Sequence, residues 1–130
     1  MSTTAAQTVS KTISNAIAPS LAFVMLYVAD LDSATSHLES LGFRYVAEES
    51  TPVFREFVGG DGQPFAIRLS MPDSAKPGSV ELYFKTPDLN ALHTALGQNG
   101  IAIGPITAMP FGTIFTVPAL DGHQLNMQQA

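Results

Sequence analysis

One order of residues occurs twice along this chain, and that repetition limits the folds it can adopt. Asp30-Leu31 opens one segment and Asp88-Leu89 opens another. At the same spacing three later positions also match, namely Leu38 with Leu96, Gly42 with Gly100, and Phe43 with Ile101. Each segment then reaches an Asp-Gly pair, at 61–62 and at 121–122. Since one copy is too short to bury a core alone, we expect two copies of one unit packed as a single domain.

Each copy has the pattern of a strand, a helix and three further strands. Short apolar runs bounded by turn residues predict strands at 21–28, 43–47, 53–58, 65–70, 80–84, 101–103, 114–117 and 125–128. Helices are expected after Asp30 or Asp32 and after Asp88, because a short carboxylate accepts the free amides of a first turn. Their buried stripes are expected to contain Ala34, Leu38 and Leu41 in the first helix and Leu89, Leu92 and Leu96 in the second. The sequence therefore predicts the α+β class, as two βαβββ modules at 21–70 and 79–128 with both helices on one face of the sheet.

Composition indicates a compact globular domain and excludes several functions. Hydrophobic residues make up 45% of the 130 residues and charged residues 13%. The six Lys and Arg are scattered and the net charge is −5, so nucleic acid is not an expected partner. No apolar run is long enough to span a membrane. Cysteine is absent, which excludes disulfides, thiolate metal sites and a Cys nucleophile. We expect a cytoplasmic protein.

Residues 1–20 precede the domain, which we place at 21–128. They are rich in Ser, Thr and Ala, and we expect a loose tail. The alternative is an arm that packs on a partner subunit, because Ile13, Ile17 and Leu21 recur at helical spacing.

Several short motifs occur in a characteristic order along residues 21–128. They are VADLD at 28–32, LGF at 41–43, TPDLN at 86–90, PFG at 110–112 and PALDGHQL at 118–125. In this order and duplication the chain resembles the vicinal oxygen chelate superfamily, which includes glyoxalases, extradiol dioxygenases and bleomycin-resistance proteins. The resemblance implies an eight-stranded sheet curved into a cup, with the helices on its outer face, often completed in a homodimer.

Metal enzymes of that superfamily place one ligand on each of four strands. The matching positions here hold Phe23, Ala66, Glu81 and Asn126. A divalent ion needs N or O donors in place of its water, and only Glu81 is a competent ligand among these four. The three histidines, His37, His93 and His123, share no metal-binding spacing. We therefore expect no metal and no other cofactor.

The alternation of side chains predicts which residues line the cup. Successive side chains of a strand point to opposite faces, and with Phe23 inward the outward residues of its strand are all apolar. The predicted ligand-binding residues are Phe23, Met25, Tyr27, Arg68, Glu81, Tyr83, Lys85, Asn126 and Gln128, with Ala66 on the same face. We expect Phe57, Phe111 and Phe115 at the rim. The sequence does not show which side chains of 53–58 face inward, so Arg55 and Glu56 are not assigned to either face.

Aromatic walls with a few convergent polar groups are typical of a small-molecule site, since unpaired polar groups in a core are costly. The alternative is that Glu81 pairs with Arg68 or Lys85 and no ligand binds. The leading hypothesis is a metal-independent binding protein of the bleomycin-resistance type, as in antibiotic resistance. It would hold a hydrophobic or aromatic ligand, which can be cationic, by stacking and by the Glu81 charge.

An enzyme is the alternative function. It would be a glyoxalase-type lyase, isomerase or dioxygenase in which Glu81 is the general base or a metal ligand, since burial in an apolar cup raises the pKa of a carboxyl group. A dimerisation or regulatory module with an empty cup is a third, weaker interpretation.

Overall fold

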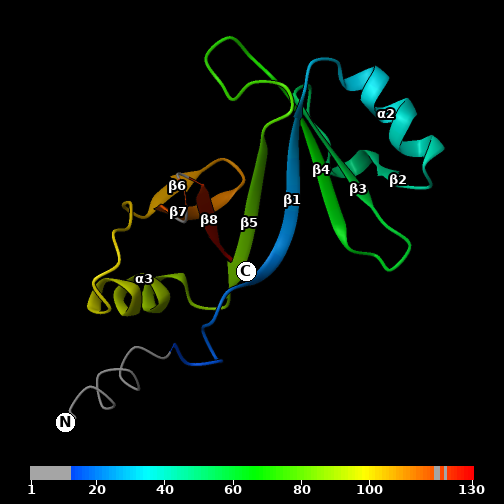
Figure 1. Ribbon diagram of the computed structural model, residues 1–130. Helices are drawn as coiled ribbons and strands as arrows, with labels where there is room; N and C mark the ends of the chain where they lie inside the picture. Colours follow the sequence, from blue (N-terminus) through cyan, green and yellow to red (C-terminus); the bar gives the residue numbers. More distant parts are fainter. Residues whose placement is uncertain (1–12, 119–120, 122) are drawn as a thin grey trace. The chain divides into compact units, whose positions relative to one another are not determined.

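The computed structural model of the chain describes residues 13–118, 121 and 123–130. The elements in chain order are β1 (Ser20–Val28), α2 (Leu31–Ser40), β2 (Arg44–Val46), the short 3-10 helix η1 (Ala47–Glu49), β3 (Phe54–Val58), β4 (Pro64–Leu69), β5 (Val80–Thr86), α3 (Leu89–Gln98), β6 (Thr107–Met109), β7 (Gly112–Pro118) and β8 (Gln124–Gln129) (Figure 1). The interpretation of residues 1–12 as a tail or arm lies outside the described residues. So do Ala119, Leu120 and Gly122 of the closing motif.

The strand order confirms two βαβββ modules of the α+β class. The strands follow one another as β2-β3-β4-β1-β5-β8-β7-β6 in a mixed eight-stranded sheet. In the first module β1 pairs with β4 in parallel, and β2–β3 and β3–β4 are antiparallel. In the second module β6–β7 and β7–β8 are antiparallel. The order of the second module mirrors that of the first, as duplication of one unit requires.

The chain forms two compact units. One contains Ala22–Tyr83, and we call it the β1 unit; the other contains Phe84–Ala130 with the residues up to Leu21, and we call it the β8 unit. Strand β5 contributes its first residues to the β1 unit and its last residues to the β8 unit. No helix among the described residues is long and apolar enough to cross a membrane.

Helix α2 covers one face of the strands in the β1 unit. Asp30 caps it by accepting a hydrogen bond from the Ser33 N–H at 3.1 Å. Its buried residues are Leu31, Thr35 and Leu38. The two leucines pack against Phe57 and Ile67. This cluster is the main core of the β1 unit.

Leu41 was expected in the buried stripe of α2, and that prediction is wrong. Leu41 is 62% exposed, because the helix ends at Ser40 and the backbone turns at Gly42 with a φ of 105°. That conformation favours glycine, since a side chain there meets the backbone.

Arg55 joins β3 to α2. Its Nη1 donates to Thr35 Oγ1 at 2.8 Å and its Nη2 to Asp32 at 2.9 Å. In the ladder Arg55 is paired with Ile67, which lies in the core under α2. Paired residues of a sheet share a face. Arg55 therefore lies on the helix side, and Glu56 lies on the opposite side.

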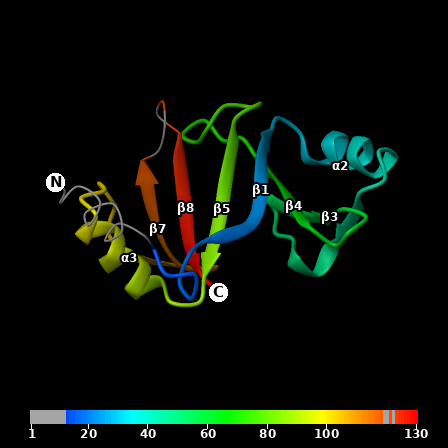
Figure 2. The same cartoon turned by 60° about the horizontal axis from the view of Figure 1, so that its bottom comes forward.

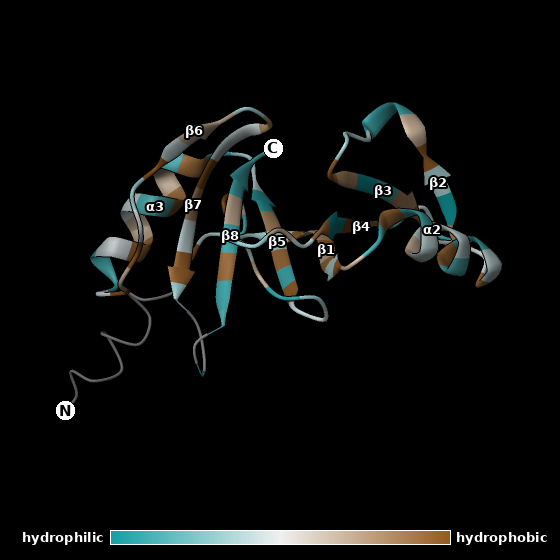
Figure 3. Ribbon diagram, turned by 90° about the horizontal axis from the view of Figure 1, so that it is seen from above, coloured by the Kyte–Doolittle hydropathy of each residue, from teal (hydrophilic) through white to brown (hydrophobic). Residues whose placement is uncertain are grey.

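Helix α3 covers one face of the β8 unit and runs alongside β7 (Figure 2). Leu89 and Leu92 are buried against Phe115 and Met127, and Leu96 packs at the edge of this cluster, as predicted for its stripe. Alternate apolar and polar residues along β7 and β8 appear as brown and teal bands in Figure 3. One face of these strands is therefore the core under α3.

The N-terminal end of α3 is held by one side chain that is distant in the sequence as well as by its cap. Asp88 accepts from the Ala91 N–H at 3.0 Å. Gln129 accepts from the Leu89 N–H at 2.8 Å and donates to the Pro87 carbonyl at 2.6 Å. The first turn of α3 is thus anchored to the end of β8.

The strand expected at 101–103 is absent from the described residues, and β6 lies later, at Thr107–Met109. In between, the Gly104 N–H donates to the Thr116 carbonyl at 2.9 Å. A Cβ at Gly104 would lie 3.1 Å from Thr116 Oγ1, so the chain approaches β7 closely there. Pro105 follows and has no N–H to donate, so regular pairing starts only beyond it.

We expect Asp88→Ala to lower the free energy of unfolding by about 1 kcal/mol, because the cap of α3 loses its acceptor. Asp88→Asn is the matched control, since its amide oxygen can still accept the Ala91 N–H. Urea unfolding followed by circular dichroism measures both. An Asn variant as unstable as the Ala variant would contradict the capping role.

Candidate functional site

The face of the β1 unit opposite α2 carries a second apolar cluster. Met25, Tyr27 and Ala66 are buried there, and the half-buried Phe23, Phe54, Ala75 and Tyr83 pack against them. Leu26 and Val28 of the same strand lie in the α2 core instead. The phase predicted for this strand is therefore confirmed. We call the face formed by Phe23, Met25, Tyr27, Phe54, Glu56, Ala66, Arg68, Glu81 and Tyr83 the aromatic face.

Strand register brings two residues to this face that the sequence did not assign. Phe54 is paired with Arg68, and Glu56 with Ala66. Across the next ladder Ala66 is paired with Met25 and Arg68 with Tyr27. Paired side chains share a face, so Phe54 and Glu56 lie on the aromatic face. The only sequence signal for this register was the glycine-rich turn at 59–62, which did not settle the parity of β3.

The aromatic rings are close enough to interact. Phe23 and Tyr83 stack with ring centroids 4.6 Å apart and planes 10° apart. Phe54 meets Phe23 edge to face, with centroids 6.3 Å apart. These are the offset and T-shaped arrangements that aromatic pairs prefer. All three rings are half-buried, so part of each remains accessible.

Glu81 accepts a hydrogen bond from a neighbouring tyrosine. The Tyr83 hydroxyl donates to Glu81 Oε1 at 3.3 Å. Burial, and next the Glu81 charge, raise the pKa of Tyr83 well above its ordinary value. The same two causes raise the pKa of Tyr27, opposed by the positive charge of Arg68. Both phenols therefore stay neutral at physiological pH and act as hydrogen-bond donors.

Arg68 is half-buried on the same face. Its Nε is shielded from solvent and has no hydrogen-bond partner within the part of the chain that the structure describes. The ion pair found among the described residues joins Arg55 to Asp32, so Glu81 forms none with Arg68 or Lys85. The alternative prediction of an internal ion pair at Glu81 is therefore wrong. The site has a carboxylate that accepts from tyrosine and a guanidinium without a carboxylate partner.

The three other predicted ligand-binding residues belong to the β8 unit. Asn126 is buried, Gln128 is half-buried and Lys85 is exposed. Asn126 and Gln128 alternate with Leu125 and Met127, which pack under α3, so they lie on the face away from that helix. Their role in ligand binding stays a prediction.

Two of the three phenylalanines expected at a rim lie in cores instead. Phe57 is 0% exposed in the core under α2, and Phe115 is 1% exposed in the core under α3. Each has the strand parity that points to the helix. Phe111 is 61% exposed at the turn between β6 and β7.

The residues at the superfamily's metal positions do not fit a metal ion. The side chains of Phe23 and Ala66 have no donor atom, so two of the four positions cannot supply a ligand. Among the described residues no three His, Asp or Glu side chains gather as a possible ion site. No step of the function proposed below depends on a metal.

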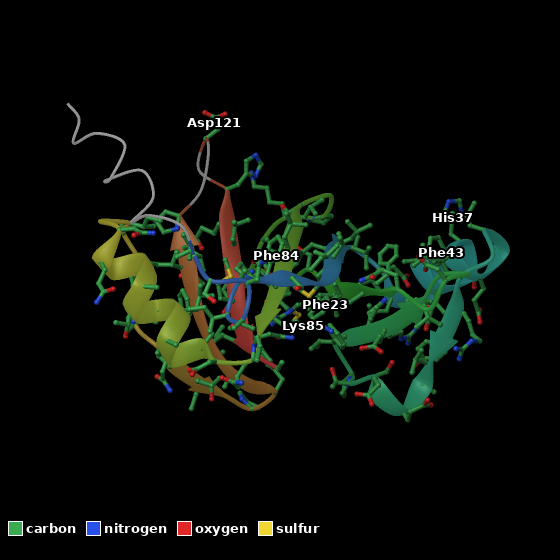
Figure 4. All side chains as sticks on the ribbon, turned by 90° about the horizontal axis from the view of Figure 1, so that it is seen from below. Phe23, His37, Phe43, Phe84, Lys85 and Asp121 are labelled. Atoms are coloured by element: carbon green, nitrogen blue, oxygen red, sulfur yellow. The ribbon has the colours of Figure 1, made fainter. Side chains whose placement is uncertain are left out.

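The histidines lie apart from the aromatic face or are exposed. His37 is exposed on α2 and points away from the strands of its unit (Figure 4). The Nε2 atom of His93 lies 2.9 Å from the Gly104 carbonyl oxygen. The His93 ring packs edge to face on Phe115. His123 is exposed.

Comparison with known proteins identifies the fold. Methylmalonyl-CoA epimerase from Mycobacterium tuberculosis is 18% identical, and the match covers 93% of this chain and 94% of that one with a TM-score of 0.68. A glyoxalase/bleomycin resistance protein/dioxygenase superfamily member from Vibrio splendidus is 17% identical over 87% of this chain and 100% of that one, with a TM-score of 0.61. A protein from Legionella pneumophila named NAD-dependent benzaldehyde dehydrogenase is 23% identical over 82% and 96%, with a TM-score of 0.63.

No family model matches the sequence, and no curated protein matches it. The structural likenesses show the fold alone. The chain has the vicinal oxygen chelate fold, as its repeated motifs predicted.

We expect Glu56→Gln to raise the thermal midpoint at pH 7. Burial, with Glu49 and Glu48, raises the pKa of Glu56 above its ordinary value of 4.5. When the folded state has the higher carboxyl pKa, its contribution to stability is fully present below the unfolded-state pKa and is lost as the pH rises through the folded-state pKa. At pH 7 the ionised Glu56 therefore destabilises the fold, and Gln removes that cost. The gain should shrink as the pH falls through the folded pKa and should be lost below about 4.5. Asp73→Asn, which removes an equal charge at an exposed position, is the control; an equal gain there would contradict the assignment.

Proposed function

We propose that this chain is a metal-independent binding protein for a hydrophobic or aromatic small molecule, and that the aromatic face of the β1 unit is its site. The observation that carries the proposal is the stacked Phe23–Tyr83 pair beside Glu81 and Arg68. A face that only completed a core would be expected to pair its polar groups, because an unpaired buried donor costs about 1–3 kcal/mol. Arg68 Nε has no such partner among the described residues.

The aromatic rings supply area for a flat ligand. Phe23 and Tyr83 are already held parallel to each other, so a ligand ring that stacks on the pair costs little side-chain ordering. Phe54 packs edge to face against Phe23. The Tyr83 hydroxyl gives its one proton to Glu81, so toward a ligand its oxygen can only accept. A homodimer, which the sequence resemblance implies, and a cytoplasmic location complete the proposal.

We expect a neutral flat probe, 2-naphthalenemethanol, to stabilise the protein. A ligand at a hundred times its Kd adds about 2.7 kcal/mol, which raises the midpoint by about ten degrees for a domain of this size. Phe23→Leu should weaken binding roughly two- to tenfold, because it removes a stacking partner. Phe111→Leu, at an exposed turn, is the matched control and should leave binding unchanged. The absence of any thermal shift or heat of binding would contradict the proposal.

An enzymatic function is the second candidate, and the contact of Glu81 favours it specifically. A carboxylate held by a tyrosine beside an aromatic ligand surface can remove a proton from a bound substrate. Such a base would act without a metal.

Glu81→Gln separates the two functions. If the protein only binds, the variant keeps its affinity for neutral aromatic probes, and neither protein exchanges ligand protons. If Glu81 is a general base, the wild type incorporates deuterium next to the carbonyl of a bound aryl ketone in D₂O, and the folded variant does not. Proton nuclear magnetic resonance of the ketone measures the exchange. Exchange in the wild type would replace the binding proposal with the enzymatic one.

A further inference from the structure

Two of the three charged groups on the aromatic face, Glu81 and Arg68, differ in how far hydrogen-bond partners already compensate their charge. Glu81 accepts a hydrogen bond from Tyr83 at 3.3 Å, and Tyr27 is a second neutral phenol beside it. At 3.3 Å this is a long, weak hydrogen bond, but it gives Glu81 a donor on this face.

Arg68 has no comparable compensation. No carboxylate pairs with it in the described part of the chain, and its Nε–H is shielded from solvent without an acceptor. Native proteins rarely leave a shielded donor unpaired, and each exception asks for an explanation such as a missing ligand. Arg68 is only half-buried, so a ligand acceptor would reach the terminal nitrogens of its guanidinium rather than the shielded Nε.

Aromatic residues are the cross-strand neighbours of Arg68. Arg68 is paired with Phe54 on one neighbouring strand and with Tyr27 on the other, all on one face. A guanidinium presents its donors as a planar fork that fits a carboxylate through two parallel hydrogen bonds. A molecule with an aromatic ring and a carboxylate could then place its ring on the aromatic side chains and its carboxylate on Arg68.

We propose that the ligand of this site is an aromatic carboxylic acid whose carboxylate is received by Arg68. This inference rests on the proposed binding function and narrows its ligand class. It differs from the cationic ligand that the sequence favoured, because the structure shows Glu81 accepting from Tyr83 while Arg68 Nε lacks an acceptor. Glu56 and Glu81 share the face, so an acid is favoured only where it reaches the guanidinium.

Three probes with one ring system and different charges test the inference. They are 2-naphthoate, 2-naphthalenemethanol and 2-naphthylmethylamine, titrated by calorimetry at pH 7. We expect naphthoate to bind the wild type at least tenfold more tightly than the alcohol, and the amine to bind no better than the alcohol. An amine that binds more tightly than naphthoate overturns the inference.

Two substitutions at Arg68 locate the effect. Arg68→Gln should abolish the preference for naphthoate over the alcohol and leave the affinity for the alcohol within twofold. Arg44→Gln, which removes the same charge from an exposed position on β2, is the matched control and should keep the preference. Arg68→Lys keeps the charge without the fork, so it should retain only part of the preference. If Arg68→Gln does not fold, Arg68→Lys tests the role of Arg68 in its place.

The outcomes distinguish this inference from the proposed function. If the alcohol binds and Arg68 adds nothing to the affinity for naphthoate, the proposed binding function is supported and the inference of an aromatic acid as ligand is wrong. If no probe binds the folded wild type, both fail. If naphthoate is preferred by the wild type and by Arg44→Gln, and the preference is lost in Arg68→Gln and reduced in Arg68→Lys, the inference is supported.

Discussion

The parallel pairing of β1 with β4 is the contact on which the β1 unit depends. Alternate residues of β1 serve two different clusters, with Leu26 and Val28 in the core under α2 and Met25 and Tyr27 on the aromatic face. A shift of one residue in this register would exchange the two sets, burying Tyr27 under the helix and exposing leucine where the polar groups lie. The core and the candidate site are therefore built by the same ladder.

The helix-side core and the aromatic face differ in whether their arginine side chains have hydrogen-bond partners. Under α2, Arg55 is satisfied by Thr35 and Asp32, and it joins a strand to a helix. On the other face Arg68 lies in the same sheet with an Nε that has no partner among the described residues. Two arginines on opposite faces thus differ: Arg55 links a strand to a helix through two hydrogen bonds, and Arg68 has a donor without a partner among the described residues. That difference supports the proposal that the aromatic face binds a ligand.

Local signals in the sequence predicted local structure well. The caps at Asp30 and Asp88, and the glycines after each helix at Gly42 and Gly100, are where the repeated motif placed them. These features depend on a few neighbouring residues, as capping and positive φ do. The errors occurred where a neighbour distant in the sequence decides. The stretch 101–103 is not a strand because Gly104 approaches Thr116 and Pro105 cannot pair.

The sequence by itself determined the α+β class, the duplicated βαβββ order, the phase of β1 and the absence of donor atoms at Phe23 and Ala66. These follow from residue type and from periodicity, which act over a few residues. Only the tertiary structure decided the rest. It paired Phe54 with Arg68 and Glu56 with Ala66, and it buried Phe57 and Phe115 under the helices. It also made Tyr83, rather than Arg68, the hydrogen-bond partner of Glu81. Strand register and side-chain packing set these contacts, because they are made between residues that only folding brings together.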